Sequence, residues 1–271
     1  MKKLYFITML IITISIYGSV SLKAQDTTAT KKVNLDVNCD LMSRYVWRGS
    51  QFGGNSPSIQ PGVSLNHKAL TFGAWGAYST GGINASQEVD LYLSTNFIND
   101  KFTAIVTDYY FPSNSIKYDY FAYGDKTGHV FEAGLSFNGT DKIPVSFSAY
   151  VNFYGNDAFK TGNDPYDTTT FNKNIGNQYS NYFEFAYSKT FKNIDFNAFL
   201  GFTLNNPKAA DSNTGYNGET GFYGNGPGIV NIGVTMSKGV KITDSFSLPL
   251  TASFILNPNA KRVYLVFGFS F

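Results

Sequence analysis

Charged side chains inside apolar stretches are the residues of this chain most able to do chemistry. Only 15% of the 271 residues are charged, so each such position is informative. Arg44 and Arg48 are four residues apart in an extended stretch, so on a strand they would share one face, about 13 Å apart. Alternation of polar and apolar residues places six further charged side chains on the same inward side: Glu88, Asp90, Asp108, Glu132, Glu184 and Arg262.

These charged residues favour two interpretations, which the sequence leaves open. An arginine fork binds a carboxylate through two parallel hydrogen bonds, which fixes the pair rigidly. The residues could form a charged constriction in the outer half of a pore, where they would select solutes. They could equally form a structural network, because charges buried away from water must be paired.

The positions of the histidines bear on the main alternative function, that of an enzyme. A hydrolase needs a nucleophile activated by a base, usually a histidine with an orienting partner. The chain has two histidines. His67 falls in a predicted short turn and His129 at a strand end with its side chain outward, and neither has a serine and an acid at a matching depth. We therefore expect two surface histidines and no enzyme activity.

Metal and cofactor sites have little support in the sequence. The loop GNDPYD offers Asp164 and Asp167 as calcium ligands, but it lacks the ligand spacing of an EF-hand, and these residue types are common turn formers. The single cysteine, Cys39, excludes a disulfide framework and a cysteine-based zinc site. The sequence therefore predicts neither a metal nor a cofactor.

The N-terminus has the pattern of an export signal. Lys2 and Lys3 precede an apolar run from Leu4 to about residue 20, and small residues follow up to Ala24. The run is short for a membrane anchor, which needs roughly 20 apolar residues. We expect a signal peptide over 1–24 and a short periplasmic tail over 25–32. The rest of the chain has 18 basic and 19 acidic residues, which argues against nucleic acid as a partner.

Period-two alternation recurs along the whole remaining chain and predicts strands. At the C-terminus, for example, Val263, Leu265 and Phe267 alternate with Tyr264 and Val266. Twelve strands are expected, near residues 33–48, 56–66, 69–79, 87–98, 101–111, 129–138, 143–154, 178–191, 193–205, 228–237, 245–256 and 261–271.

The gaps between these strands alternate in length. They are long after Phe111, Tyr154 and Asn205, and short in between, as at Lys192–Asn193. Outer-membrane barrels have this asymmetry, with short periplasmic turns and longer extracellular loops, whereas a soluble β-sandwich has no reason for it. The sequence thus predicts one domain over 33–271, an all-β transmembrane antiparallel barrel in the bacterial outer membrane. Its apolar side chains would contact lipid and its polar ones would line the lumen. Four inward tyrosines would narrow that lumen: Tyr92, Tyr150, Tyr182 and Tyr264.

The segment 43–138 resembles the TorF-like or Gcw-type family of proposed bacterial outer-membrane porins. The resemblance is carried by SRYVWRG (43–49), PSIQPG (57–62), FGAWG (72–76), EVDLY (88–92) and DYYFP (108–112), in that order and at similar spacing. It implies an outer-membrane barrel with a porin function. The C-terminal alternation through Phe267, Phe269 and Phe271 also resembles the signal that the outer-membrane assembly machinery reads.

The function we expect is passive passage of small solutes or ions through a narrow lumen. Two other classes remain open at this point. One is a barrel whose extracellular loops bind a ligand or partner, and the other is a membrane-embedded hydrolase.

Overall fold

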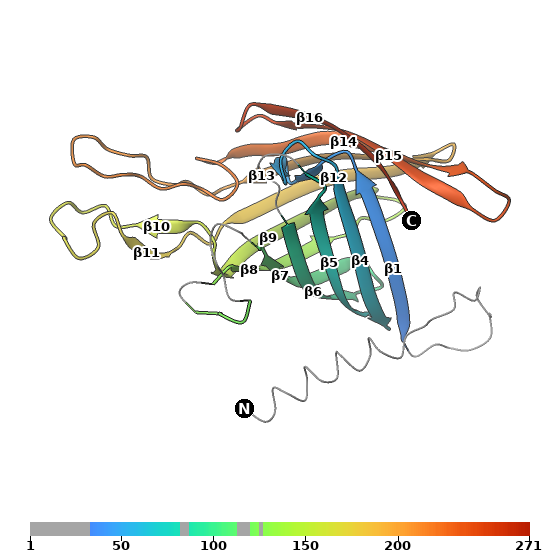
Figure 1. Ribbon diagram of the computed structural model, residues 1–271, viewed down its shortest axis with the longest axis horizontal. Coiled ribbons are helices and arrows are strands. Elements are labelled where there is room, and N and C mark those ends of the chain that lie inside the picture. The colour runs from blue at the N-terminus through green and yellow to red at the C-terminus, as the bar shows by residue number, and fades with distance from the viewer. Residues whose placement is uncertain (1–32, 82–86, 113–119, 125–126) are drawn as a thin grey trace, which may run out of the picture. The chain divides into compact units, whose positions relative to one another are not determined.

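The computed structural model describes residues 33–81, 87–112, 120–124 and 127–271, and residues Val33–Phe271 form one compact unit (Figure 1). The predicted signal peptide and periplasmic tail lie outside the described residues. Every regular element in the described residues is a β-strand. None of the described residues belongs to a helix with the length and apolarity to cross a membrane.

Twelve antiparallel strands close into a barrel, which confirms the predicted fold class. In spatial order they are β1, β16, β15, β14, β13, β12, β9, β8, β7, β6, β5 and β4. Their bounds are β1 (Asn34–Met42), β4 (Ser58–His67), β5 (Leu70–Ser79), β6 (Gln87–Phe97), β7 (Phe102–Tyr110), β8 (His129–Phe137), β9 (Val145–Gly155), β12 (Asn181–Phe191), β13 (Ile194–Thr203), β14 (Gly228–Lys241), β15 (Ser247–Asn257) and β16 (Arg262–Ser270). Two small hairpins stand apart from the barrel sheet, β2 (Tyr45–Trp47) with β3 (Ser50–Phe52) and β10 (Phe159–Thr161) with β11 (Asn174–Asn177).

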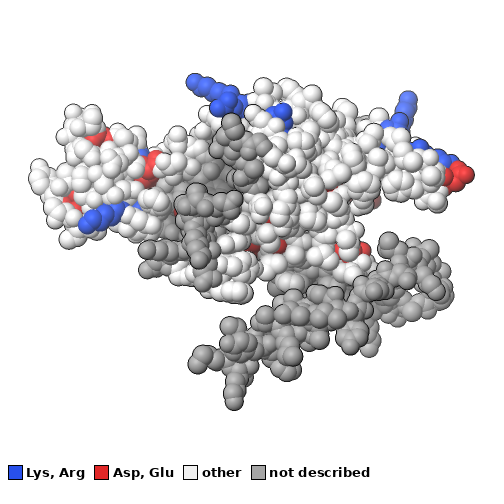
Figure 2. All heavy atoms as spheres, in the orientation of Figure 1, with Lys and Arg blue, Asp and Glu red and all other residues white. Residues whose placement is uncertain are grey.

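The strand connections differ between the two ends of the barrel. At one end, here named the short-turn end, neighbouring strands join through tight turns, as between β12 and β13. At the other, the long-loop end, the β9–β12 connection carries the β10–β11 hairpin, which projects at the left of Figure 1. Charged side chains project mainly near the two ends on the face shown in Figure 2, and its middle is largely uncharged.

The outward face of the barrel is apolar and the inward face is mostly polar. Outward side chains are exposed although they are large and apolar, for example Val37 (72% exposed), Leu93 (54%) and Leu265 (60%). Because strand partners face the same side of a sheet, the pairing registers carry this alternation around the whole barrel. A soluble protein rarely exposes so continuous an apolar surface.

Tyrosine rings in the lumen lie against glycines of the neighbouring strand. A Cβ atom added to Gly73 would lie 2.2 Å from Cζ of Tyr92. Gly134 and Gly201 stand in the same relation to Tyr150 and Tyr182, with the nearest ring atoms at 2.4 Å and 2.5 Å. The predicted inward direction of Tyr92, Tyr150 and Tyr182 is therefore correct, but their rings lie over the barrel wall.

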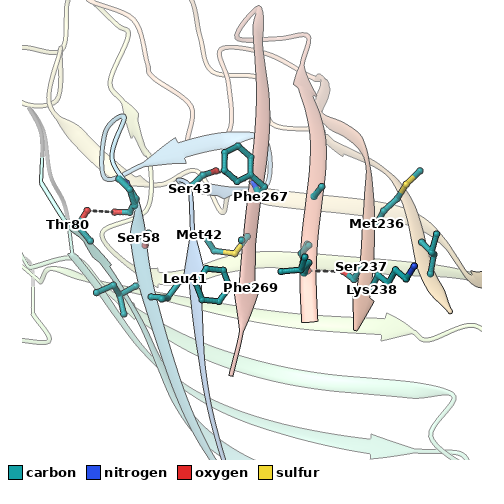
Figure 3. A pocket seen from close by; sticks show the side chains of 17 residues that line it. Leu41, Met42, Ser43, Ser58, Thr80, Met236, Ser237, Lys238, Phe267 and Phe269 are labelled. Atoms are coloured by element: carbon teal, nitrogen blue, oxygen red, sulfur yellow. Dashed lines mark hydrogen bonds between the residues drawn. The ribbon is translucent and has the colours of Figure 1, made fainter. Parts of the chain in front are cut away.

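The barrel closes through a short seam between its first and last strands. β1 pairs with β16 over three residue pairs, Asp40–Met42 with Gly268–Ser270, whereas β1 pairs with β4 over nine. Beyond these pairs, Cys39 and Phe271 exchange backbone hydrogen bonds, and the C-terminus lies beside β1 in Figure 1. Figure 3 shows the seam, with Phe267 beside Ser43 and Phe269 beside Leu41 and Met42. A mostly apolar groove of about 920 Å³ runs along it.

The prediction of one strand over 33–48 is wrong at its C-terminal part. β1 ends at Met42, and the hairpin β2–β3 follows, with Arg48 and Gly49 as its two turn residues. Their φ angles of 47° and 75° are those of a type I′ turn, which matches the twist of a hairpin. Arg44 and Arg48 consequently do not share a strand face.

Gly49 fixes where this hairpin lies. A Cβ atom at Gly49 would stand 1.9 Å from the carbonyl oxygen of Val230, so only glycine allows the approach to β14. The side-chain amide of Asn257 also donates a hydrogen bond to the Gly49 carbonyl at 3.0 Å. The hairpin is thereby held against β14 and the end of β15.

Candidate functional site

The hairpin Tyr45–Phe52, named here the lumenal hairpin, folds into the barrel interior. The Tyr45 ring packs on Trp75 of β5 at 5.4 Å between centroids, and Trp47 packs on Tyr109 of β7 at the same distance. Trp75 and Tyr109 both face the lumen, because their common register neighbour Asp90 does. The tip of the hairpin therefore meets the far wall of the lumen.

Arg48 at that tip forms the most buried ion pair among the described residues. Its guanidinium donates two hydrogen bonds to Glu132 of β8, of which Nη2 to Oε1 measures 2.9 Å. The two side chains are 9% and 2% exposed. Tyr109 donates a further hydrogen bond to Glu132 at 2.9 Å. Of the carboxylates predicted to face the arginines, Glu132 is the one that Arg48 binds.

Aromatic rings enclose the Arg48 guanidinium. Its Cζ atom lies 4.4 Å from the ring centre of Trp47, 4.1 Å from that of Tyr150 and 4.5 Å from that of Tyr182. Nη1 also donates to the hydroxyl of Tyr223, which comes from the β13–β14 loop. Cation–π contacts strengthen where water is excluded, so the packing and the ion pair support each other. The contribution of Tyr223 was not visible in the sequence, because a loop residue carries no period.

Three other predicted residues lie apart from this pair. Arg44 donates to Gln51 at 3.1 Å within the lumenal hairpin and contacts none of the predicted carboxylates. Glu184 accepts hydrogen bonds from the Tyr182 hydroxyl and from the Asn231 amide. Arg262 is exposed at the start of β16.

Glu88 and Asp90 form a second, separate carboxylate group on β6. Both are buried, with 3% and 6% of their surface exposed. The Tyr45 side chain lies beside Glu88. One oxygen of each, Oε1 of Glu88 and Oδ1 of Asp90, is buried without a hydrogen-bond partner among the described residues.

A cavity of about 420 Å³ opens beside the lumenal hairpin. Asp90 lies in its wall with Asn38, Gly62, Ile105 and Thr107. The remaining lining is aromatic and comes from Tyr45, Trp47, Trp75, Tyr92 and Tyr109.

Asp108 and His129 are corrections to the sequence analysis. Asp108 pairs in register with Phe131, whereas lumenal Thr107 pairs with Glu132, so Asp108 faces outward. There its Oδ1 lies 2.7 Å from Nδ1 of His129. His129 is fully buried, not a surface residue, because the segment containing Tyr120 covers it. A charged residue is tolerated on this face because it has a buried partner.

Both nitrogens of the His129 ring have a partner. Nε2 lies 2.7 Å from the carbonyl oxygen of Tyr120, and Nδ1 binds Asp108. Rings of Tyr110, Tyr120 and Tyr123 pack around it at 4.6–5.0 Å between centroids. The geometry is that of a latch between the β7–β8 connection and the outer wall.

The carboxylates of the candidate calcium loop accept hydrogen bonds from the turns of the loop itself. Asp164 accepts a hydrogen bond from the backbone of Tyr166 at 2.9 Å. Asp167 accepts hydrogen bonds from Thr169 and Thr170, which lower the pKa of its carboxyl to about 2. The described residues contain no group of three or more histidine, cysteine, aspartate or glutamate side chains that could hold a metal ion.

Comparison with known proteins identifies a family and several similar solved chains. A family model described as a bacterial protein of unknown function (Gcw_chp) matches residues 26–212. No curated protein sequence is similar enough to be a relative. One solved chain, described under "Unveiling the Mechanism Behind the in-meso Crystallization of Membrane Proteins", aligns over 87% of this chain and 81% of its own, with 8% identity and a TM-score of 0.45.

Proposed function

This chain belongs to the Gcw_chp family, and from that premise and its closed barrel we propose that it is a porin-like channel of the bacterial outer membrane. It would pass small solutes or ions passively through a narrow lumen. The observation that carries the proposal is the contrast between the two faces of the barrel. Large apolar side chains are exposed outward while charged and polar ones are buried inward, which is the arrangement a closed barrel needs in lipid.

The orientation follows from the two ends of the barrel. Short turns would face the periplasm and the long loops the cell exterior, after export by the signal peptide over 1–24. The assembly machinery would recognise the last strand through Phe267, Phe269 and Phe271. Of these, Phe267 and Phe271 are 59% and 63% exposed, as lipid contact requires.

The constriction of this channel would be the tip of the lumenal hairpin. Arg48 and Glu132 meet there inside the lumen, with aromatic rings on several sides. Solutes would pass between the hairpin and the β5–β7 wall, where the 420 Å³ cavity lies. One network thus serves both interpretations of the charged residues, packing and selection.

Loop-mediated binding of a partner is the second candidate, and one observation favours it. The β10–β11 hairpin and the β13–β14 loop are tied together, by Asn172 to the Gly215 carbonyl at 3.0 Å and by Lys208 to Asn163 at 3.0 Å. Such ordered loops could present a fixed surface. An enzyme is not part of the proposal, since both nitrogens of His129 are engaged.

Conductance in planar bilayers tests the channel directly. The purified full chain, folded and heat-modifiable on gels, should give discrete conductance steps. A folded preparation that inserts but stays silent would overturn the channel and favour the loop-binding candidate.

Surface labelling tests the orientation. Epitope tags inserted at Asn163 or Asn217 should be accessible on intact cells, and a tag at Asp141 should not. Labelling at Asp141 would invert the assignment of the two ends.

A further inference from the structure

The aromatic cavity beside the lumenal hairpin contains one carboxylate without a partner. Asp90 is 6% exposed, and its Oδ1 atom accepts no hydrogen bond from a described residue. A buried charge or polar atom of this kind costs free energy unless something pairs with it. The cavity of about 420 Å³ into which Asp90 faces leaves room for such a group.

The nearby arginines do not fill this role. Arg48 is held by Glu132, and Arg44 donates to Gln51. Glu88, two residues from Asp90 on the same face, adds a second buried carboxyl and also leaves an oxygen unpaired. These two carboxyls therefore offer acceptor oxygens to a bound cation, and no lysine or arginine among the described residues forms an ion pair with them.

The other walls of the cavity also favour a cation. Faces of tyrosine and tryptophan attract cations through their ring quadrupole, most strongly for tryptophan. Five aromatic side chains line the cavity: Tyr45, Trp47, Trp75, Tyr92 and Tyr109. A metal ion would need several oxygen ligands, whereas an alkylammonium ion needs a carboxylate and an apolar or aromatic surround.

We propose that this cavity is a binding site for a small alkylammonium ion, whose N–H groups donate to Asp90 while its carbon chain lies among the aromatic rings. The volume lies within the range of about 300–1,000 Å³ that is usual for small-molecule sites. The inference rests on the proposed function, because it names the class of solute that the lumen would hold.

The chain provides its own reporter for this site. It contains two tryptophans, Trp47 and Trp75, and both line the cavity. Tryptophan fluorescence of the folded, detergent-solubilised full chain should change saturably on titration with n-butylammonium chloride. n-Butanol, which has the same chain and no charge, and KCl at matched ionic strength should give no saturable change.

An isosteric variant tests the role of Asp90. Asp90→Asn should weaken n-butylammonium binding by at least about tenfold, since it removes the charge of a desolvated ion pair. Asp36→Asn is the matched control. Asp36 is an exposed carboxylate on the inward face of β1, and it does not line the cavity. This variant should bind n-butylammonium as the wild type does.

Three results would overturn the site: no fluorescence response in the folded wild type, equal binding of n-butanol, or unchanged affinity in Asp90→Asn. Conductance of the same preparations separates this inference from the channel. Conductance without n-butylammonium binding refutes the site alone. Binding without conductance refutes the channel and leaves the site.

Discussion

Replacing Arg48 by alanine should damage the barrel more than any other single change to a charged lumenal residue. Glu132 would stay buried at 2% exposure with its ion-pair partner gone. Breaking a buried pair from one side costs about 3–5 kcal/mol. Two tyrosine hydroxyls, Tyr109 at 2.9 Å and Tyr223 at 3.2 Å, would still donate to Glu132. We therefore expect a loss near the lower end, about 3 kcal/mol.

Equilibrium unfolding in urea, read on heat-modifiable gels, measures this loss. The double variant Arg48→Ala/Glu132→Gln should recover about half of it, because the uncompensated charge is removed as well. Arg44→Ala is the matched control and should cost less than about 1 kcal/mol, since the side chain of Arg44 donates a hydrogen bond only to Gln51 among the described residues.

The same variants report on permeation. If the tip of the lumenal hairpin limits the pore, Arg48→Ala should raise single-channel conductance and shift selectivity toward cations. Arg48→Ala with wild-type stability, conductance and reversal potential would refute the role assigned to the pair in both packing and selection.

Three further changes test other parts of the structure. Gly49→Ala should prevent normal folding, because the added Cβ would stand 1.9 Å from a backbone oxygen of β14, and the heat-modifiable band should be lost. Gly215→Ala is the control and should fold, because Gly215 also has a positive φ but lies in open space. His129→Ala should release the segment that covers it and speed cleavage within 120–124 by chymotrypsin, and an unchanged cleavage rate would contradict the latch. The Asp167 carboxyl should titrate near pH 2 by NMR, below the usual value of about 3.9, so its contribution to loop order is complete above about pH 4 and lost as the pH falls through 2. A midpoint near pH 4 would mean that the threonine hydrogen bonds do not form.

The barrel could be predicted because apolar and polar residues alternate along each strand, which indicates the face that is turned outward. All twelve predicted strands have a counterpart, and the alternation in loop length follows the two ends of the barrel. The exception is the end of the first strand. Alternation continues through Tyr45 and Trp47, because the lumenal hairpin is itself made of extended residues. The one local signal of the turn was the dipeptide Arg48–Gly49, which is weaker than the usual Asn-Gly.

The candidate site was predictable in its residue types and less so in its contacts. Glu88, Asp90, Glu132 and Glu184 face inward as their parity requires. The alternation predicted that Asp108 faces inward, but its neighbours Thr107 and Tyr109 occupy that face and Asp108 faces outward. Its partner lies under a segment that folds back over the outer wall, a tertiary contact that no period in the sequence records.

The tyrosines that lie over glycines in the lumen have a consequence for how the width of this barrel can change. Each ring occupies the space that a Cβ atom of the opposite residue would fill, at Gly73, Gly134 and Gly201. Replacing one of these tyrosines by a smaller side chain would expose the barrel wall beneath the ring, and it would widen the bore only slightly. Adding a single methyl group at one of the glycines would lift the ring off the wall toward the axis. The bore of this barrel is therefore adjustable through its smallest residues, by substitutions that leave every aromatic and charged group in place.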